Sequence, residues 1–100
     1  MGILSKIFGL KPKVDIGQML ADGAIIVDVR TKQEFQAGHN KNAINIPLDQ
    51  LEKGISKISK DQAIITCCAS GIRSSAAKGK LIALGYNVEN GGGWMNLRKY

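Results

Sequence analysis

The sequence predicts one α/β domain with a central parallel sheet of about five short strands and helices on both faces. Segments 24–30 and 63–67 are almost continuously apolar and rich in β-branched residues, which is typical of parallel strands covered on both sides. Segments with helical spacing alternate with the strand segments, as in parallel α/β sheets. The 100 residues suffice for one domain, which we assign to residues 13–100 after an N-terminal leader, residues 1–12.

Capping and turn residues delimit the helices predicted in the first half of the chain. Asp15 is placed to cap a short helix, with Gln18 at the capping-box position. After the first strand segment, Thr31 and Glu34 have the spacing of a second capping box, and Gly38 closes that helix. These signals predict one short helix before the first strand in the sequence and one after it.

The rest of the chain continues the alternation. We predict a short strand at 43–46, a helix at 48–58 that Gly54 weakens, a helix at 74–84 and a last strand at 86–90. The glycines at 91–93 permit either tight turns or a close approach of the backbone to a neighbour. A final helical turn is expected to pack Trp94 and Leu97 on the core.

The composition is that of an ordinary globular protein with a moderately basic surface. Hydrophobic residues make up 44% of the chain and charged residues 22%, and the formal net charge is +6. The lysines are spread along the chain without interleaved aromatic residues, so we expect attraction of small anions and no nucleic-acid binding. The apolar start of the chain is interrupted by Lys6, so neither a transmembrane segment nor a signal peptide is expected there.

Two adjacent cysteines and a lone histidine exclude several kinds of site. Cys67 and Cys68 cannot form a long-range cross-link, and neighbouring thiols favour a reducing compartment, the cytoplasm. His39 is the only histidine, so the sequence holds no Cys/His spacing for zinc and supports a Cys–His hydrolase poorly. A structural hydrogen bond in its turn is the favoured role of His39.

Cys68 is the candidate nucleophile because of its position in the predicted fold. It follows a strand of a parallel sheet, at the edge where ligands bind, and precedes a helix N-terminus, whose dipole favours a thiolate. Four residues, 69–72, separate it from Arg73, and so short a loop can direct N–H groups at one point above the sulfur. Arg73 fits an anion clamp and a loop brace equally well. Strand alternation points Cys67 to the opposite face, as a small buried residue.

A set of short fragments along the chain carries a family resemblance. They are Ile26-Val27-Asp28-Val29-Arg30, Glu34-Phe35, Gly38-His39, Ala43-Ile44-Asn45-Ile46-Pro47-Leu48, Cys68-Ala69-Ser70-Gly71-Ile72-Arg73-Ser74, Leu84-Gly85-Tyr86 and Asn90-Gly91-Gly92. In this order and spacing they resemble the rhodanese domain, in particular the small single-domain bacterial sulfurtransferases. The similarity extends over residues 15–97.

The resemblance implies a rhodanese-like fold and a sulfurtransferase activity. Cys68 takes the catalytic position and would carry a persulfide from thiosulfate or another persulfide donor to cyanide or a thiol. The substrate-binding residues would be Ala69, Ser70, Gly71, Ile72, Arg73 and Ser74, and Asp28 and Arg30 would brace the site from beneath. No metal or organic cofactor is implied. We expect a monomer, with a sulfur-relay protein as a candidate partner.

The length and charge of the loop separate the neighbouring chemistries. Dual-specificity phosphatases and arsenate reductases resemble this layout but have one more loop residue, which fits a tetrahedral oxyanion, so the shorter loop favours transfer of a single sulfur atom. Ala69 and Ile72 are neutral where members that prefer thiosulfate tend to carry cations, so thiosulfate is expected to be a poor donor. The alternative function is a weakly catalytic persulfide carrier or interaction domain that docks to a sulfur-relay partner.

Overall fold

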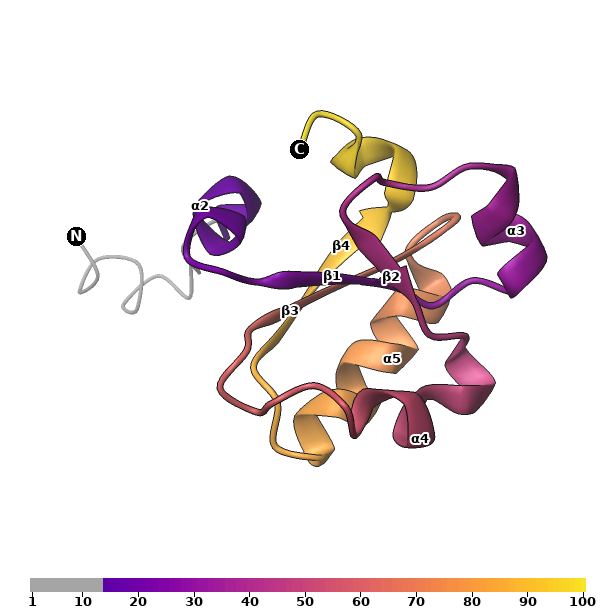
Figure 1. Ribbon diagram of the computed structural model, residues 1–100. Helices are drawn as coiled ribbons and strands as arrows, with labels where there is room; N and C mark the ends of the chain where they lie inside the picture. The colour runs from indigo at the N-terminus through magenta and orange to yellow at the C-terminus, as the bar shows by residue number, and fades with distance from the viewer. Residues whose placement is uncertain (1–13) are drawn as a thin grey trace, which may run out of the picture.

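The computed structural model describes residues 14–100 and has the predicted α/β architecture (Figure 1). One parallel sheet has the strand order β2-β1-β3-β4. The strands are β1 (Ile25–Asp28), β2 (Ala43–Asn45), β3 (Ile64–Cys68) and β4 (Val88–Gly93). The prediction of about five strands is one too many for the described residues, because each of the four strand segments forms one strand and no other segment of 14–100 joins the sheet. The predicted leader, residues 1–12, lies outside the described residues.

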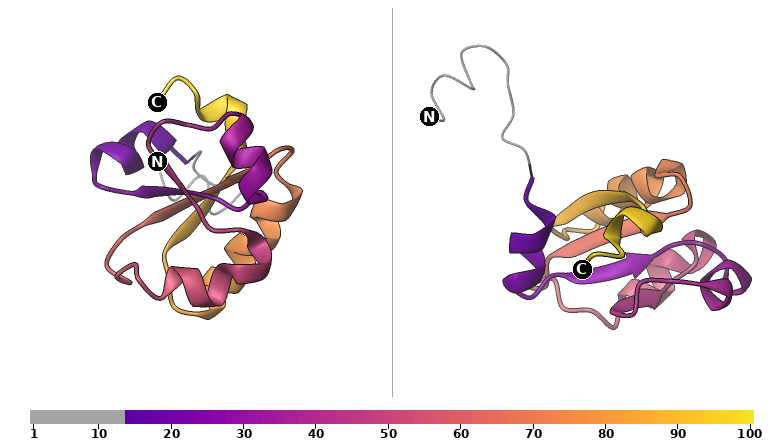
Figure 2. Two further views of the ribbon diagram at one scale, coloured as in Figure 1. Left: turned by 45° about the vertical axis from the view of Figure 1, so that its right-hand side comes forward. Right: turned by 90° about the horizontal axis from the view of Figure 1, so that it is seen from above.

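Helices cover both faces of the sheet, as predicted. They are α2 (Ile16–Ala21), α3 (Lys32–Ala37), α4 (Leu51–Ile55) and α5 (Ile72–Ala83), with the 3-10 helices η1 (Leu48–Gln50) and η2 (Trp94–Leu97). Helices α4 and α5 pack on one face, and α2 and η2 pack on the other (Figures 1 and 2). Helix α3 follows the carboxyl end of β1, at the right of Figure 1. Between residues 14 and 100, no helix is long and apolar enough to cross a membrane.

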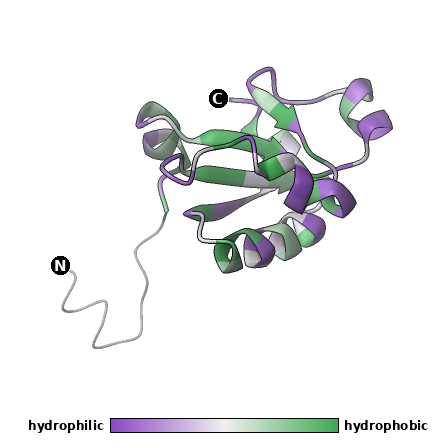
Figure 3. Ribbon diagram, turned by 60° about the horizontal axis from the view of Figure 1, so that its bottom comes forward, coloured by the Kyte–Doolittle hydropathy of each residue, from purple (hydrophilic) through white to green (hydrophobic). Residues whose placement is uncertain are grey.

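The alternation of side chains along β3 divides the core into two clusters. Ile64 and Cys68 pack in the cluster beneath α4 and α5, whereas Ile65 and Cys67 pack in the cluster beneath α2 and η2, where Leu97 is buried. The central strands are accordingly hydrophobic in Figure 3. The predictions of strands buried on both faces, and of two cysteines pointing to opposite faces, are confirmed.

Both predicted helix caps are present. The Asp15 carboxylate accepts the Gln18 N–H at 3.0 Å, although the Gln18 side chain donates to Asp22 and not back to the cap. At α3, the Thr31 hydroxyl oxygen accepts the Glu34 N–H at 3.2 Å, and Glu34 Oε1 accepts the Thr31 N–H at 3.1 Å. The second pair is a complete capping box, and it holds the Glu34 carboxylate in place at the start of α3.

Two helices have bounds that differ from the prediction. Helix α5 begins at Ile72, ahead of the predicted start at 74, because Gly71 adopts a φ of 99° and turns the chain directly into the helix. The predicted helix at 48–58 divides into η1 and α4, and Gly54 lies within α4. A Cβ on Gly54 would lie 2.5 Å from Ile46 Cγ2, so this glycine makes room for the Ile46 side chain.

The glycines at 91–93 belong to β4. The register of β4 against β3 shifts between Thr66 and Cys68, which marks a bulge at the end of the strand pair. A Cβ on Gly93 would lie 2.9 Å from the carbonyl oxygen of Ala69. Of the two roles that the sequence left open for these glycines, the structure shows the close backbone approach.

This packing leads to a prediction about stability. A Cβ on Gly91 would lie 2.9 Å from Ile65 Cγ2 and 3.0 Å from Leu97 Cδ1, so Gly91→Ala should overpack the core and lower the free energy of unfolding by about 1–3 kcal/mol. The matched control is Gly79→Ala in α5, where nothing lies within 4 Å of the added Cβ. That change should raise the free energy by about 0.5–1 kcal/mol. Urea unfolding measures both, and an unchanged midpoint for Gly91→Ala would contradict the close contact.

Candidate active site

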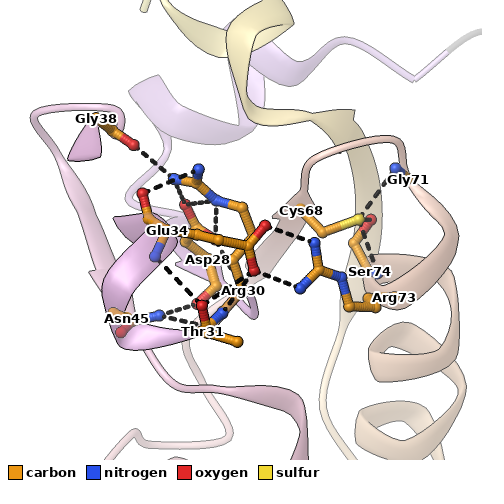
Figure 4. Close-up of polar contacts among 10 residues, drawn as sticks. All are labelled: Asp28, Arg30, Thr31, Glu34, Gly38, Asn45, Cys68, Gly71, Arg73 and Ser74. Atoms are coloured by element: carbon orange, nitrogen blue, oxygen red, sulfur yellow. Dashed lines mark hydrogen bonds and ion pairs between the residues drawn. The ribbon is translucent and has the colours of Figure 1, made fainter. Parts of the chain in front are cut away.

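Cys68, the last residue of β3, lies under a loop that directs hydrogen-bond donors at its sulfur (Figure 4). The Gly71 N–H donates to Cys68 Sγ at 3.0 Å, and the Ser74 N–H donates at 3.4 Å. The Ser74 side-chain oxygen also lies 3.4 Å from Sγ. Cys68 has no exposed surface, whereas Ala69 and Ser70 in the loop above it are exposed. Donors from the loop and from the first turn of α5 therefore converge on a single enclosed sulfur atom.

Two glycines and one asparagine shape the loop. Gly71 and Gly92 both have positive φ, 99° and 79°, and a Cβ on Gly71 would lie 3.3 Å from Gly92 Cα. Asn90 ties the two backbones together. Its Nδ2 donates to the Gly71 carbonyl oxygen at 3.2 Å, and its Oδ1 accepts the Gly92 N–H at 2.9 Å. The bulge of β4 thus supports the loop around Cys68 from the side.

Ser74 can serve as a hydrogen-bond partner for both protonation states of Cys68. Its hydroxyl donates to Asn90 Oδ1 at 2.7 Å, which leaves its oxygen to accept the Cys68 S–H. A serine carries one hydroxyl proton, so donation to a thiolate requires the hydroxyl to turn from Asn90 to Sγ. After that rotation Asn90 Oδ1 still has a hydrogen-bond partner, because it continues to accept the N–H of Gly92.

The two neighbouring thiols differ in electrostatics. Burial works to raise the pKa of Cys68, but hydrogen bonds from the Ser74 side chain and from the N–H groups of Ser74, Gly71 and Ser70 outweigh it and hold the pKa below its usual value. Burial raises the pKa of Cys67 to about 12, and the nearby Asp28 carboxylate adds to the rise. At neutral pH, Cys68 is therefore the more readily ionised thiol, and Cys67 stays protonated.

Asp28 and Arg30 form a buried ion pair at the end of β1. Arg30 Nη2 lies 2.7 Å from Asp28 Oδ2, and the side chains are 5% and 0% exposed. The guanidinium also donates to the carbonyl oxygens of Gly38, at 2.7 Å, and Glu34, at 3.3 Å, and it lies 4.7 Å above the centre of the Trp94 ring. One cation thus connects β1, α3 and η2. That it braces the loop around Cys68 stays a prediction.

Arg73, the first charged residue after Cys68, is held by Glu34 of α3 (Figure 4). Its Nη1 and Nη2 donate to Glu34 Oε1 at 2.6 Å and Oε2 at 2.9 Å in a bidentate pair. Hydrogen bonds from Arg73 and from the Thr31 N–H lower the pKa of Glu34 to about 2, so the carboxylate is charged at every ordinary pH. Of the clamp and brace roles predicted for Arg73, this geometry is that of a brace between α5 and α3.

The other candidate residues lie around this centre or apart from it. Ala69, Ser70 and Ile72 contribute backbone to the loop, and the Ile72 side chain is 78% exposed. His39 Nδ1 lies 2.6 Å from the carbonyl oxygen of Phe35, and the two rings stack at 3.7 Å, which confirms its structural role. Within residues 14–100, no group of three or more His, Cys, Asp or Glu side chains could hold a metal ion.

Two contributors to the site escaped the sequence reasoning. The sequence predicts Glu34 as a helix cap and as part of a family fragment, but nothing local to it indicates a partner at Arg73. Asn90 is predicted only as the end of the last strand and as part of a family fragment. An asparagine directly before glycines does signal a turn or bulge, and that signal could have pointed to Asn90 as a backbone ligand.

Two hollows of the described part of the chain lie apart from Cys68, and Arg73 lines the smaller of them. The larger, about 910 Å³, lies along β2, η1 and α4. The smaller, about 400 Å³, is lined by residues that include Arg73, Lys80 and Asp49. Cys68 itself lines neither of these two hollows.

Comparisons with known proteins agree with this geometry. A family model for the rhodanese-like domain matches residues 14–98. A solved rhodanese with anions from E. coli is 34% identical, with a TM-score of 0.68 over 74% of this chain and 91% of that chain. A rhodanese-like domain protein from Staphylococcus aureus is 29% identical, with a TM-score of 0.68 over 96% of this chain and 83% of that chain.

Curated relatives include longer proteins with a different name. The tRNA uridine(34) hydroxylases of Salmonella newport and Hamiltonella defensa are each 34% identical, over 73% and 77% of this chain. The chain spans 23% and 25% of the length of these two relatives. Since the family model covers almost all of the described residues, the chain belongs to the rhodanese-like domain family.

Proposed function

We propose that this protein is a sulfurtransferase that carries a sulfane sulfur as a persulfide on Cys68. The observation that carries the proposal is the convergence of the Gly71 and Ser74 N–H groups on Cys68 Sγ. Such donors stabilise a thiolate, and they equally suit the terminal sulfur anion of a persulfide. Membership of the rhodanese-like domain family supports sulfur transfer as the class of reaction.

Two displacements complete the proposed cycle. In the first, the Cys68 thiolate attacks the outer sulfur of the donor and forms a new S–S bond. The S–S bond of the donor breaks, and the leaving group takes its electron pair. The leaving group is sulfite from thiosulfate or a thiolate from a hydropersulfide. In the second, cyanide or a thiol attacks the terminal sulfur, which yields thiocyanate or a new persulfide and restores the Cys68 thiolate. The electrons balance without an added oxidant or reductant.

The loop and its supports divide the work of binding in this proposal. We assign donor binding to the backbone of Ala69 through Ser74, because the exposed loop residues lie on the approach to Sγ. Asp28 and Arg30 act as a brace, holding the end of β1 against α3. Two unpaired thiols suit a reducing compartment, and we propose the cytoplasm as the location.

A second candidate is a persulfide carrier that passes sulfur to a partner protein. Arg73, the loop's charged residue, is already engaged by Glu34, which favours docking over capture of free anions. Domains of this kind also form parts of longer proteins, since the chain spans about a quarter of its curated relatives. The name tRNA uridine(34) hydroxylase describes those whole proteins and does not by itself assign hydroxylation to this chain. Salt-sensitive complexes with negligible turnover of small donors would favour the carrier.

The nucleophile is tested by paired cysteine variants. Cys68→Ser should reduce cyanide-dependent thiocyanate formation to background, and intact-mass measurement should show no added sulfur after exposure to a donor. Cys67→Ser should keep most of the activity, because Cys67 packs on the opposite face of the sheet. Full activity in Cys68→Ser, or near-complete loss in Cys67→Ser, would overturn the assignment.

The thiolate is tested by the pH dependence of alkylation, measured with iodoacetamide in a Cys67→Ser background. The rate follows the thiolate fraction of Cys68, so its midpoint should lie below the free-thiol pKa of about 8.5. Ser74→Ala removes a donor to the charged form and should raise the midpoint by about one pH unit. A wild-type midpoint at or above 8.5, or no shift in Ser74→Ala, is incompatible with the proposed cradle.

A further inference from the structure

The charge of the loop is cancelled by a residue from another helix. Between Ala69 and Ser74, Arg73 is the only residue with a formal charge. Its guanidinium is engaged at both ends by the Glu34 carboxylate, at 2.6 and 2.9 Å. The smaller hollow beside Arg73 is also lined by Lys80 and Asp49, whose charges oppose each other. Arg73 and the hollow beside it therefore contribute little net positive charge next to the loop around Cys68.

Glu34 is held in this position by contacts that do not involve Arg73. Its Oε1 accepts both the N–H and the hydroxyl of Thr31, each at 3.1 Å. Its backbone carbonyl accepts a hydrogen bond from the buried Arg30, which also holds the Gly38 carbonyl at the other end of α3. Because these contacts already hold the carboxylate, pairing with Arg73 orders only the arginine side chain, although the two side chains are 36% and 35% exposed.

We propose that Glu34 sets the donor preference of Cys68: by neutralising Arg73, it selects hydropersulfides over dianionic donors such as thiosulfate. This inference rests on the proposed sulfur transfer. The attack brings a thiolate against the charge of the donor, which is −2 for thiosulfate and −1 for an ionised hydropersulfide. A free guanidinium would offset that repulsion, and it would do so most for the dianion.

Glu34→Gln tests the proposal with little disturbance of the fold. Glutamine also serves at this position of a capping box, so the bond from the Thr31 N–H is kept. The neutral amide accepts from Arg73 through one oxygen only and leaves the positive charge uncancelled. Glu52→Gln is the matched control, because it removes the same charge from an exposed position on α4.

The measurement is the rate of sulfur addition to Cys68, followed by intact mass, with thiosulfate and with 2-hydroxyethyl hydropersulfide. An exposed cation should raise the rate of sulfur addition about threefold for each unit of negative charge on the donor. The ratio of the thiosulfate rate to the hydropersulfide rate should therefore rise about threefold in Glu34→Gln and stay unchanged in Glu52→Gln. The gain should shrink as salt screens the guanidinium.

The outcomes separate this inference from the function on which it rests. If neither donor adds sulfur to Cys68 in the wild type, the proposed function and the inference both fail. If sulfur is added but the ratio is unchanged in Glu34→Gln, or rises equally in Glu52→Gln, only the inference fails. Ile72→Lys adds a cation at an exposed loop position without touching Glu34. It should also raise the ratio, and an unchanged ratio there would overturn the charge argument even if Glu34→Gln did not fold.

Discussion

The buried ion pair of Asp28 and Arg30 is the contact that joins three elements next to the site. One guanidinium contacts Asp28 at the end of β1, the carbonyl oxygens of Glu34 in α3 and of Gly38 directly after it, and the face of Trp94 in η2. Breaking such a pair would leave a charge without compensation in the interior, at a cost of about 3–5 kcal/mol. Arg30 also donates to the carbonyl oxygen of Glu34, the residue whose carboxylate pairs with Arg73. Glu34 in turn holds Arg73, the second residue of the helix that starts beside Cys68.

The neighbouring cysteines provide an internal comparison for the effect of hydrogen bonding on a buried thiol. Both residues have no exposed surface, and both lie in β3. Cys67 faces an apolar cluster next to a carboxylate, and its pKa rises to about 12. Around Cys68, hydrogen bonds from Ser74, Gly71 and Ser70 outweigh the effect of burial and lower the pKa. Burial and a neighbouring carboxylate therefore keep one thiol protonated, whereas the hydrogen-bond donors of the loop favour ionisation of the other.

Residue patterns predicted those features of the fold that depend on contacts between near neighbours in the sequence. The Asp15 cap and the Thr31–Glu34 capping box follow from residue spacing, because a cap is a contact within one turn of the chain. The start of α5 was misplaced, because Gly71 and not a serine turns the chain into the helix. For the glycines at 91–93 the sequence allowed either a tight turn or a close approach of the backbone. Only pairing with β3 distinguishes a bulged strand from a turn.

By itself, the sequence determined the α/β fold class, the position of Cys68 at a strand end, and the opposite direction of Cys67. These follow from periodicity along single segments, which the backbone geometry of strands imposes. Only the tertiary structure decided which groups surround the sulfur and which residue Arg73 contacts. Glu34 meets Arg73 across 39 positions of the chain, and Asn90 meets Ser74 across 16. No local pattern encodes such contacts, because they exist only after separate elements have packed on one sheet.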